Sequence, residues 1–264
     1  MVRFQSSVLW GRLFGMAVIW QRKLGQTRYE VRSAGRSLRL YTDGVFHSQF
    51  NPGSPVSGGV WDLLFVPALF LPPERIRRVL LLGVGGGAVI RQLQHFLAPE
   101  AIAGVELDPV HLQVARRFFR VGGQGVELYQ ADARGWLEGY RGTPFDLIID
   151  DLFAGRDGEP VRSIEATAGW LGQLARRLAK GGVLTMNLPS ARSLRQCGYF
   201  TSARTRERFA AAYQFTLPHY ENVIGAFARN AVTLPQLHRH LQRFRELDTR
   251  RRSCRLRFRA RKMG

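Results

Sequence analysis

The chain has 264 residues, of which 45% are hydrophobic and 11% aromatic, so it is long and apolar enough to fold around a sizeable core. This composition excludes wholesale disorder. The formal net charge is +19. Only two cysteines are present, Cys197 and Cys254, and they exclude both a disulfide framework and a cysteine metal site. We therefore expect a globular, cytoplasmic protein without a bound metal.

The N-terminal quarter predicts β-structure. Residues 8–20 are apolar, but the stretch is too short to span a membrane, contains Arg12 and lacks a cleavage site. We expect a helix or strand that packs on the body. Residues 28–44 alternate between apolar and polar side chains around a central glycine, which indicates a β-hairpin. The segment 51–59, rich in Gly, Pro and Ser, is the expected domain boundary.

From about residue 76, short apolar runs alternate with segments of helical periodicity. The expected strands are 78–83, 102–107, 125–130, 145–150 and 183–188. The expected helices are 88–97, 109–119, a short one around Trp136, and 165–179. Strands that alternate with helices predict an α/β fold with a doubly wound, mostly parallel sheet. Ligands of such sheets bind at the carboxyl ends of the strands.

The C-terminal part predicts an extension of this sheet and a basic surface. Residues 211–229 suggest two antiparallel edge strands, 234–247 a helix, and 254–261 a half-buried strand with arginines on one face. Residues 191–264 hold 17 basic and 4 acidic side chains, a net charge of +13. Such a field attracts polyanions, although a merely solvated basic face is the alternative. The expected units are a β-rich region (1–58), a nucleotide-binding domain (59–232) and a basic extension (233–264).

A glycine-rich turn follows the first strand of the α/β block. Gly83, Gly85 and Gly87 would let the backbone approach a nucleotide and leave helix N–H groups free to donate. Glu106, at the end of the next strand, is placed to accept hydrogen bonds from ribose hydroxyls, or is simply a charge at a strand end. Asp132 is placed to accept from an adenine amino group beside the N–H of Ala133, or to cap the following helix.

These motifs resemble those of the class I S-adenosylmethionine-dependent methyltransferase fold. More narrowly, residues 36–230 resemble the spermidine synthase family of aminopropyltransferases, through "RVLLLGVGGGAVIRQL", "GVELDP", "YQADARGWL", "FDLIIDDLF", "LAKGGVLTMNL" and "LYTDGVF". The resemblance implies a seven-stranded Rossmann-like methyltransferase sheet, a small N-terminal β-hairpin domain, a homodimer and a sulfonium nucleoside as cofactor. The cofactor-binding residues are then expected to be Gly83, Gly85, Gly86, Gly87, Glu106, Leu107, Asp132, Ala133 and Asp150.

One departure from the family bears on which cofactor binds. The family has an aspartate at the position of Gly86, near the aminopropyl end of decarboxylated S-adenosylmethionine. Two like charges in contact repel by about 1 kcal/mol in water and several in a protein cleft. The loss of the aspartate therefore favours ordinary S-adenosylmethionine, which keeps its carboxylate.

The substrate half of the resemblance is weaker. The family aspartate that orients or deprotonates the attacking amine matches Asp151, the expected catalytic residue, whereas its second aspartate corresponds to Ala154. His47 stands where the family has glutamine, with Gln49 two residues later. These two residues and Tyr41 are the expected substrate-binding residues. The other polyamine-binding elements of the family find no match.

The leading hypothesis is therefore an S-adenosylmethionine-dependent methyltransferase on a spermidine synthase-like scaffold, acting on an amine or another methyl acceptor. The first alternative is a divergent aminopropyltransferase that uses decarboxylated S-adenosylmethionine. The second alternative is a non-catalytic protein that binds nucleotide or polyanion.

Overall fold

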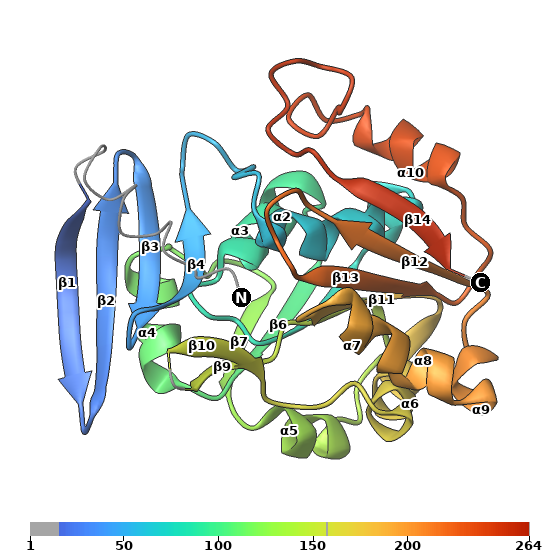
Figure 1. Cartoon of the computed structure of the whole chain (residues 1–264), viewed down its shortest axis with the longest axis horizontal. Coiled ribbons are helices and arrows are strands. Elements are labelled where there is room, and N and C mark those ends of the chain that lie inside the picture. The colour runs from blue at the N-terminus through green and yellow to red at the C-terminus, as the bar shows by residue number, and fades with distance from the viewer. Residues whose placement is uncertain (1–15, 157, 264) are drawn as a thin grey trace.

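The computed structural model describes residues 16–156 and 158–263. A large central sheet lies between helices, and a smaller antiparallel sheet stands at one side of it (Figure 1). The expected α/β class and the doubly wound arrangement are confirmed.

The central sheet has eight strands in the order β14-β12-β13-β11-β8-β5-β6-β7. They are β5 (Arg78–Leu82), β6 (Ala101–Glu106), β7 (Val126–Gln130), β8 (Phe145–Asp150), β11 (Leu178–Leu188), β12 (Ala211–Thr216), β13 (Val223–Ala228) and β14 (Arg259–Met263). The strands from β7 to β11 pair in parallel, and β13, β12 and β14 add antiparallel pairs. The chain winds outward from β5 in both directions. The carboxyl end of β5 is thus the switch point where ligands of such sheets bind.

Helices cover both faces of the sheet. They are α2 (Val60–Phe65), α3 (Ala88–Phe96), α4 (Pro109–Arg117), α5 (Ala133–Gly139), α6 (Ala168–Arg177), α7 (Ala191–Gln196), α8 (Gly198–Thr201), α9 (Ala203–Arg206), α10 (Leu234–Leu241) and the 3-10 turns η1 (Val66–Phe70) and η2 (Pro73–Arg75). Alternate residues of β5 enter two separate cores. Val79 and Leu81 pack with α2, α3 and α10, whereas Leu80 and Leu82 pack with α5 and α6. Burial on both faces explains why this strand is apolar throughout.

The N-terminal sheet has four antiparallel strands, β1 (Ala17–Leu24), β2 (Thr27–Ala34), β3 (Ser37–Thr42) and β4 (Val45–Phe50). The predicted hairpin is β2 with β3, and it gains a strand on either side. The apolar stretch 8–20 lies mostly outside the described residues, and its described end belongs to β1. Strand β4 packs on the glycine turn, where the Ala88 N–H lies 3.4 Å from Ser48 Oγ.

The C-terminal segment joins the central sheet. Strand β14 pairs with β12, so the sheet has eight strands where seven were expected. Leu256 is fully buried while Arg255 and Arg257 are exposed, as the alternation predicted, although regular pairing begins only at Arg259. Helix α10 ends six residues before the predicted end, and the chain then turns around Asp248. The domain boundaries at 58 and 232 stay predictions.

A short hairpin, β9 (Phe153–Arg156) with β10 (Glu159–Arg162), was not expected from the sequence. It begins two residues after Asp151, and Gly155 lies against Val45 of β4. The hairpin therefore flanks the carboxyl end of β8. Within residues 16–156 and 158–263, no helix is long and apolar enough to cross a membrane.

Candidate active site

The glycine turn between β5 and α3 brings the backbone close to the carboxyl end of β8. Gly83 has a φ of +85°, and a Cβ atom there would lie 2.2 Å from the carbonyl oxygen of Asp151. Any other residue would collide with that carbonyl, so glycine is required. The Asp151 N–H in turn donates to the Leu82 carbonyl at 2.8 Å. The turn and the candidate catalytic residue are thus fixed to each other by backbone.

The Glu106 carboxylate binds the same turn. Its Oε2 accepts from the N–H groups of Val84 (2.9 Å) and Gly85 (2.8 Å), and its Oε1 accepts from the Asp108 N–H (3.0 Å). A carboxylate offers about four acceptor positions, so three are used within the protein. In this arrangement the Glu106 carboxylate faces the glycine turn and His111, and its ribose role stays a prediction.

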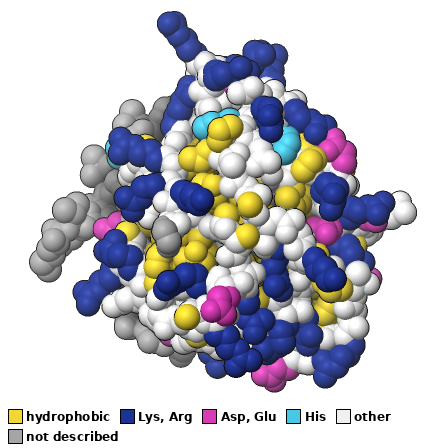
Figure 2. Space-filling view, turned by 90° about the vertical axis from the view of Figure 1, so that its right-hand side faces the viewer, with side chains coloured by type: hydrophobic (Ala, Val, Ile, Leu, Met, Phe, Trp, Pro, Cys, Tyr) yellow, Lys and Arg dark blue, Asp and Glu magenta, His cyan; other side chains and the backbone are white. Residues whose placement is uncertain are grey.

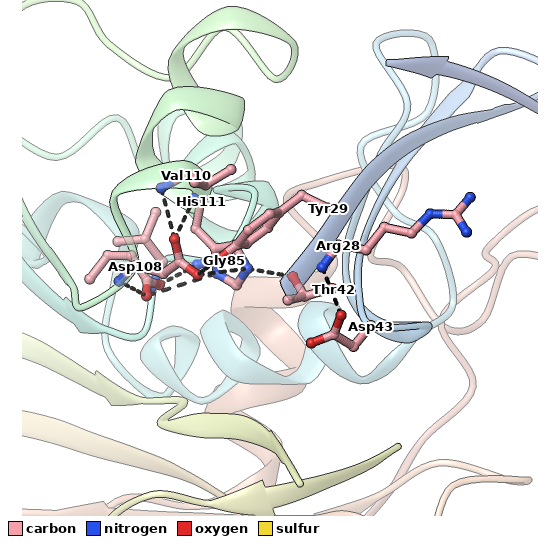
Figure 3. Close-up of polar contacts among 10 residues, drawn as sticks. Arg28, Tyr29, Thr42, Asp43, Gly85, Asp108, Val110 and His111 are labelled. Carbon is pink, nitrogen blue, oxygen red and sulfur yellow. Dashed lines mark hydrogen bonds and ion pairs between the residues drawn. The ribbon is translucent and has the colours of Figure 1, made fainter. Parts of the chain in front are cut away.

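His111 lies next to Glu106, and sequence reasoning missed it. Its Nδ1 lies 3.8 Å from Glu106 Oε1, and its Nε2 lies 2.8 Å from Thr42 Oγ1 of the N-terminal sheet (Figure 3). Burial alone would lower the pKa of His111, but the carboxylates of Glu106 and Asp108 outweigh it and raise the pKa. A single histidine in the first turn of a predicted helix carries no sequence signal for this role.

Asp108 joins the N-terminal sheet to α4. Its Oδ1 accepts from the Val110 N–H at 2.8 Å and caps the helix, while its Oδ2 accepts from the hydroxyl of Tyr29 at 2.7 Å (Figure 3). Tyr29 is 5% exposed. Together with the Thr42 to His111 bond, this contact anchors the small sheet beside the loop that follows Glu106.

Three further residues expected to bind the cofactor, Leu107, Asp132 and Ala133, follow the ends of β6 and β7. Leu107 is 68% exposed although it is apolar, which leaves its side chain free to pack on a ligand. Asp132 is exposed and caps α5, with Oδ1 accepting from the N–H groups of Arg134 and Gly135, both at 3.0 Å. Ala133 is buried. The capping role that the sequence left open is therefore present, and the adenine role stays a prediction.

Asp150 and Asp151 are adjacent but lie in different surroundings. Asp150 is fully buried, and its Oδ2 accepts from Arg162 Nη2 and Trp170 Nε1, each at 2.8 Å. Both of these hydrogen bonds come from protein side chains, and they stabilise the end of β8. Successive residues of a strand point to opposite sides. Asp151 accordingly points elsewhere and is partly exposed.

Asp151 is a titratable group at the strand ends whose surroundings fit acid–base chemistry. Burial raises its pKa to about 6, and the neighbouring Asp150 adds to the rise. The Asn187 side chain donates from Nδ2 to Asp151 Oδ1 at 2.7 Å and partly opposes that rise. A carboxylate with a pKa just below neutrality can accept a proton and release it again.

The three expected substrate residues lie at different places. His47 is beside the site, with its carbonyl oxygen 3.3 Å from the position of a Cβ on Gly85. Gln49 instead accepts a hydrogen bond from Arg39 Nε at 2.9 Å. Tyr41 is buried beneath the Arg32 guanidinium, 4.3 Å from its ring centre. The structure brings His47 to the glycine turn. Gln49 and Tyr41 instead contact other residues of the N-terminal sheet.

Position 86 is filled rather than open. A Cβ atom on Gly86 would lie 2.9 Å from the ring of Phe119 and 2.9 Å from the Cβ of Ser48. Position 86, where the family has an aspartate, is therefore packed against neutral side chains. The negative charge is absent, as the sequence indicates, but the vacated volume belongs to the protein.

Two hollows in the described part of the chain lie beside these residues. One is between residues 49–57 and α3, and the other between β10, the start of α6 and α7. Neither is lined by Glu106, Asp132 or Asp151. The candidate site is therefore defined by the converging strand ends and not by either of these two hollows.

Comparison with curated proteins identifies relatives by sequence. The chain is 32% identical over 159 residues to the polyamine aminopropyltransferase of Vibrio vulnificus, a match covering 59% of this chain and 49% of that protein. It is 31% identical over 188 residues to the polyamine aminopropyltransferase of Mycobacterium tuberculosis, covering 68% and 34%. The chain spans about half or less of these relatives. No model of a protein family matches it.

Comparison with solved structures identifies the fold. Spermidine synthase from Thermotoga maritima matches with a TM-score of 0.64 at 16% identity, over 86% of this chain and 78% of that one. A probable spermidine synthase from Corynebacterium glutamicum matches with a TM-score of 0.65 at 18% identity, over 85% and 87%. The chain has the fold of these spermidine synthases. Human methyltransferase-like protein 13, solved with SAH, matches with a TM-score of 0.58 at 20% identity, over 73% and 93%.

The spermidine synthase-like chain thus has the class I methyltransferase arrangement that its motifs predicted. Its strand order places β5, β6, β7 and β8 so that their carboxyl ends meet around the glycine turn. The roles of the individual site residues stay predictions.

Proposed function

We propose that this chain is an enzyme that transfers a carbon group from a sulfonium nucleoside to an amine. The observation that carries the proposal is Asp151, a carboxylate with a pKa raised to about 6 at the carboxyl end of β8, beside the glycine turn. An amine must lose a proton to form the new bond, and a carboxylate at this place can take it.

Aminopropyl transfer from decarboxylated S-adenosylmethionine is the first candidate. The curated relatives are named polyamine aminopropyltransferases, and two of the structural neighbours are spermidine synthases or probable ones. These similarities favour the aminopropyl alternative over the methyl-transfer hypothesis that led the sequence analysis. Because the chain spans only part of these relatives, their activity is carried over here as a proposal.

Methyl transfer from S-adenosylmethionine is the second candidate, and one observation favours it. Gly86 and its neighbours Phe119 and Ser48 carry no charge where the family has an aspartate. This end of the candidate site then lacks the charge that would repel a carboxylated cofactor by several kcal/mol at contact in a cleft. A structural neighbour of the same fold was solved with SAH.

The proposed chemistry is the same for either group. The amine nitrogen forms a bond to the carbon next to the sulfonium as the carbon–sulfur bond breaks, and the sulfur keeps the electron pair as a neutral thioether. Asp151 accepts the proton that leaves the nitrogen. Glu106 and the glycine turn would hold the nucleoside, so that nitrogen, carbon and sulfur lie in line.

A product assay tests the proposal and separates the two candidates. Purified protein would be incubated with putrescine and either decarboxylated or ordinary S-adenosylmethionine, and the released nucleoside identified by chromatography. Methylthioadenosine with the first cofactor means aminopropyl transfer, and S-adenosylhomocysteine with the second means methyl transfer. Asp151→Asn should abolish turnover and keep nucleoside affinity. Absence of both products with a panel of amines would overturn the proposed transfer to an amine.

The basic C-terminal segment supports a further proposal, contact with a polyanion. Figure 2 shows many Lys and Arg and few Asp and Glu side chains on the side of the molecule that carries α8, α9, α10 and β14. Arg259, Arg261 and Lys262 of the edge strand are exposed. The alternative is edge protection, because charges on an edge strand hinder pairing with other chains. A homodimer and the cytoplasmic location likewise stay proposals.

A further inference from the structure

Asn187 connects Asp151 to a third side chain. Its Nδ2 donates to Asp151 Oδ1 at 2.7 Å, and its Oδ1 accepts from Asn222 Nδ2 at 3.0 Å. Asn187 belongs to β11 and is 4% exposed, whereas Asn222 directly precedes β13. The two strands are paired, with Asn187 opposite Ile224. The contact between the two asparagines therefore follows from the sheet register.

The second contact fixes which way the Asn187 amide points. The carboxamide of asparagine has an acceptor end and a donor end, and nothing in its shape distinguishes them. A carboxylate such as Asp151 needs the donor end. An ionised Asp151 can only accept, so it takes the Nδ2 end of Asn187; the oxygen of Asn187 then faces Asn222, whose Nδ2 donates to it and holds the amide in that orientation.

The backbone of Asn187 is held as well. Arg162 Nη1 donates to its carbonyl at 2.5 Å, and the same guanidinium pairs with Asp150. The side chain therefore has one defined position between its two partners. Its bond ends on Oδ1 of Asp151, and Oδ2 has no hydrogen-bond partner among residues 16–156 and 158–263.

We propose that Asn222 is a positioning residue, which acts through Asn187 to hold Oδ1 of Asp151 and leave Oδ2 for the acceptor amine. This inference rests on the proposed function for the role of Asp151. It deepens that function by assigning the residues that orient the carboxylate. Neither asparagine touches the reacting atoms in this scheme.

The electrostatic surroundings give the inference a measurable consequence. The charged groups that act on Asp151 are Asp150 and Glu106, which raise its pKa, and Arg162, which lowers it. Burial is the largest cause of the raised pKa, and the bond from Asn187 is the largest opposing one. Loss of that bond should therefore raise the pKa of Asp151 further above about 6.

The test is a titration of the Asp151 carboxyl by NMR in protein labelled with carbon-13 at aspartate Cγ. Asn187→Leu removes the donor and should shift the titration upward by about one unit. Asn222→Leu keeps the donor but frees the amide to turn, and should shift it upward by a smaller amount. Asn222→Asp keeps the size of the side chain but presents only acceptors when it is ionised. The Asn187 amide should then turn its N–H groups away from Asp151, and the titration should shift upward. Asn230→Leu, at an exposed asparagine after β13, is the matched control and should leave the titration unchanged.

The outcomes separate this inference from the proposed function, because the titration needs no turnover. A shift in Asn187→Leu without any shift in the two Asn222 variants would overturn the role of Asn222. No shift in any variant would overturn the whole arrangement. If the protein is active, the acid limb of its kcat/KM profile should move with the titration. If it is inactive while the titration shifts, the proposed function and the role of Oδ2 toward an amine fail, and the hydrogen-bonded arrangement of Asn222, Asn187 and Asp151 stands.

Discussion

The imidazole rings of His47 and His111 lie with their centroids 4.8 Å apart and their planes at 56°. Two positive charges at this separation in a buried site repel strongly, so the pair carries one positive charge at most near neutral pH. Glu106 and Asp108 lie nearer to His111, and its pKa is raised. Burial lowers the pKa of His47 to about 4, and His111 adds to the effect. His47 therefore stays neutral.

This pair predicts a pH-dependent effect of His47→Gln on stability. The folded protein resists protonation of His47, whereas the unfolded chain takes a proton below pH 6.5. Stability contributed by the neutral ring is thus complete above pH 6.5 and is lost as the pH falls toward 4. The variant should gain about 2 kcal/mol relative to wild type between pH 8 and pH 5, as measured by urea unfolding. An equal difference at both pH values would contradict the assigned charge state.

Glu106→Gln tests the proposed nucleoside site. Glutamine retains one acceptor oxygen for the turn but loses the charge and half of the acceptor positions. Loss of a hydrogen bond to a charged group should weaken binding of methylthioadenosine or S-adenosylhomocysteine by about 10- to 100-fold, as measured by calorimetry. Glu138→Gln, an exposed residue of α5, is the control and should bind as wild type does. Equal affinities of the two variants would exclude Glu106 from the binding site.

Arg162→Met should be strongly destabilising. The side chains of Arg162 and Asp150 are 4% and 0% exposed, and removal of one partner leaves a buried charge. Such a change costs about 3–5 kcal/mol in chemical denaturation. Arg243→Met breaks the ion pair with Glu74, whose side chains are 48% and 62% exposed, and should change stability little. Similar losses for both variants would show that the Asp150 pair is not a buried one.

Gly86→Ala tests whether position 86 is packed. The added methyl group meets Phe119 and Ser48 at 2.9 Å, so the variant should lose about 1–3 kcal/mol of stability. The smaller side chain in Phe119→Leu should make the alanine tolerable, and the double variant should lose less than the sum of the single ones. Additive losses would mean that Phe119 does not limit this position.

The basic edge strand predicts a change in the salt dependence of polyanion binding. Arg259→Ala with Arg261→Ala should reduce the slope of log affinity against log salt for a labelled DNA duplex by about 0.9 per lost phosphate contact. Arg116→Ala with Arg120→Ala removes the same charge at exposed positions around the end of α4 and should change the slope less. Equal slopes would mean that only net charge matters. Deletion of the segment is unsuitable because Leu256 and Met263 are buried.

Much of the fold was predictable because its signals are local. The strand at 145–150 is predicted to the residue, and the helix at 88–97 ends one residue earlier than expected. Buried parallel strands are apolar runs, and helices repeat their apolar positions every three to four residues, so both patterns lie within a few neighbouring residues. The same locality explains the prediction of the glycine turn and of Asp132 as a possible cap.

By itself, the sequence determined the α/β alternation, the spermidine synthase-like motifs and the absence of a carboxylate at position 86. Only the tertiary structure decided that Asp150 pairs with Arg162, that His111 stands beside Glu106, and that Asn222 reaches Asn187. These partners are separated by 5 to 35 residues along the chain. Their contacts depend on strand register and on how the small sheet packs, and no local periodicity encodes either one.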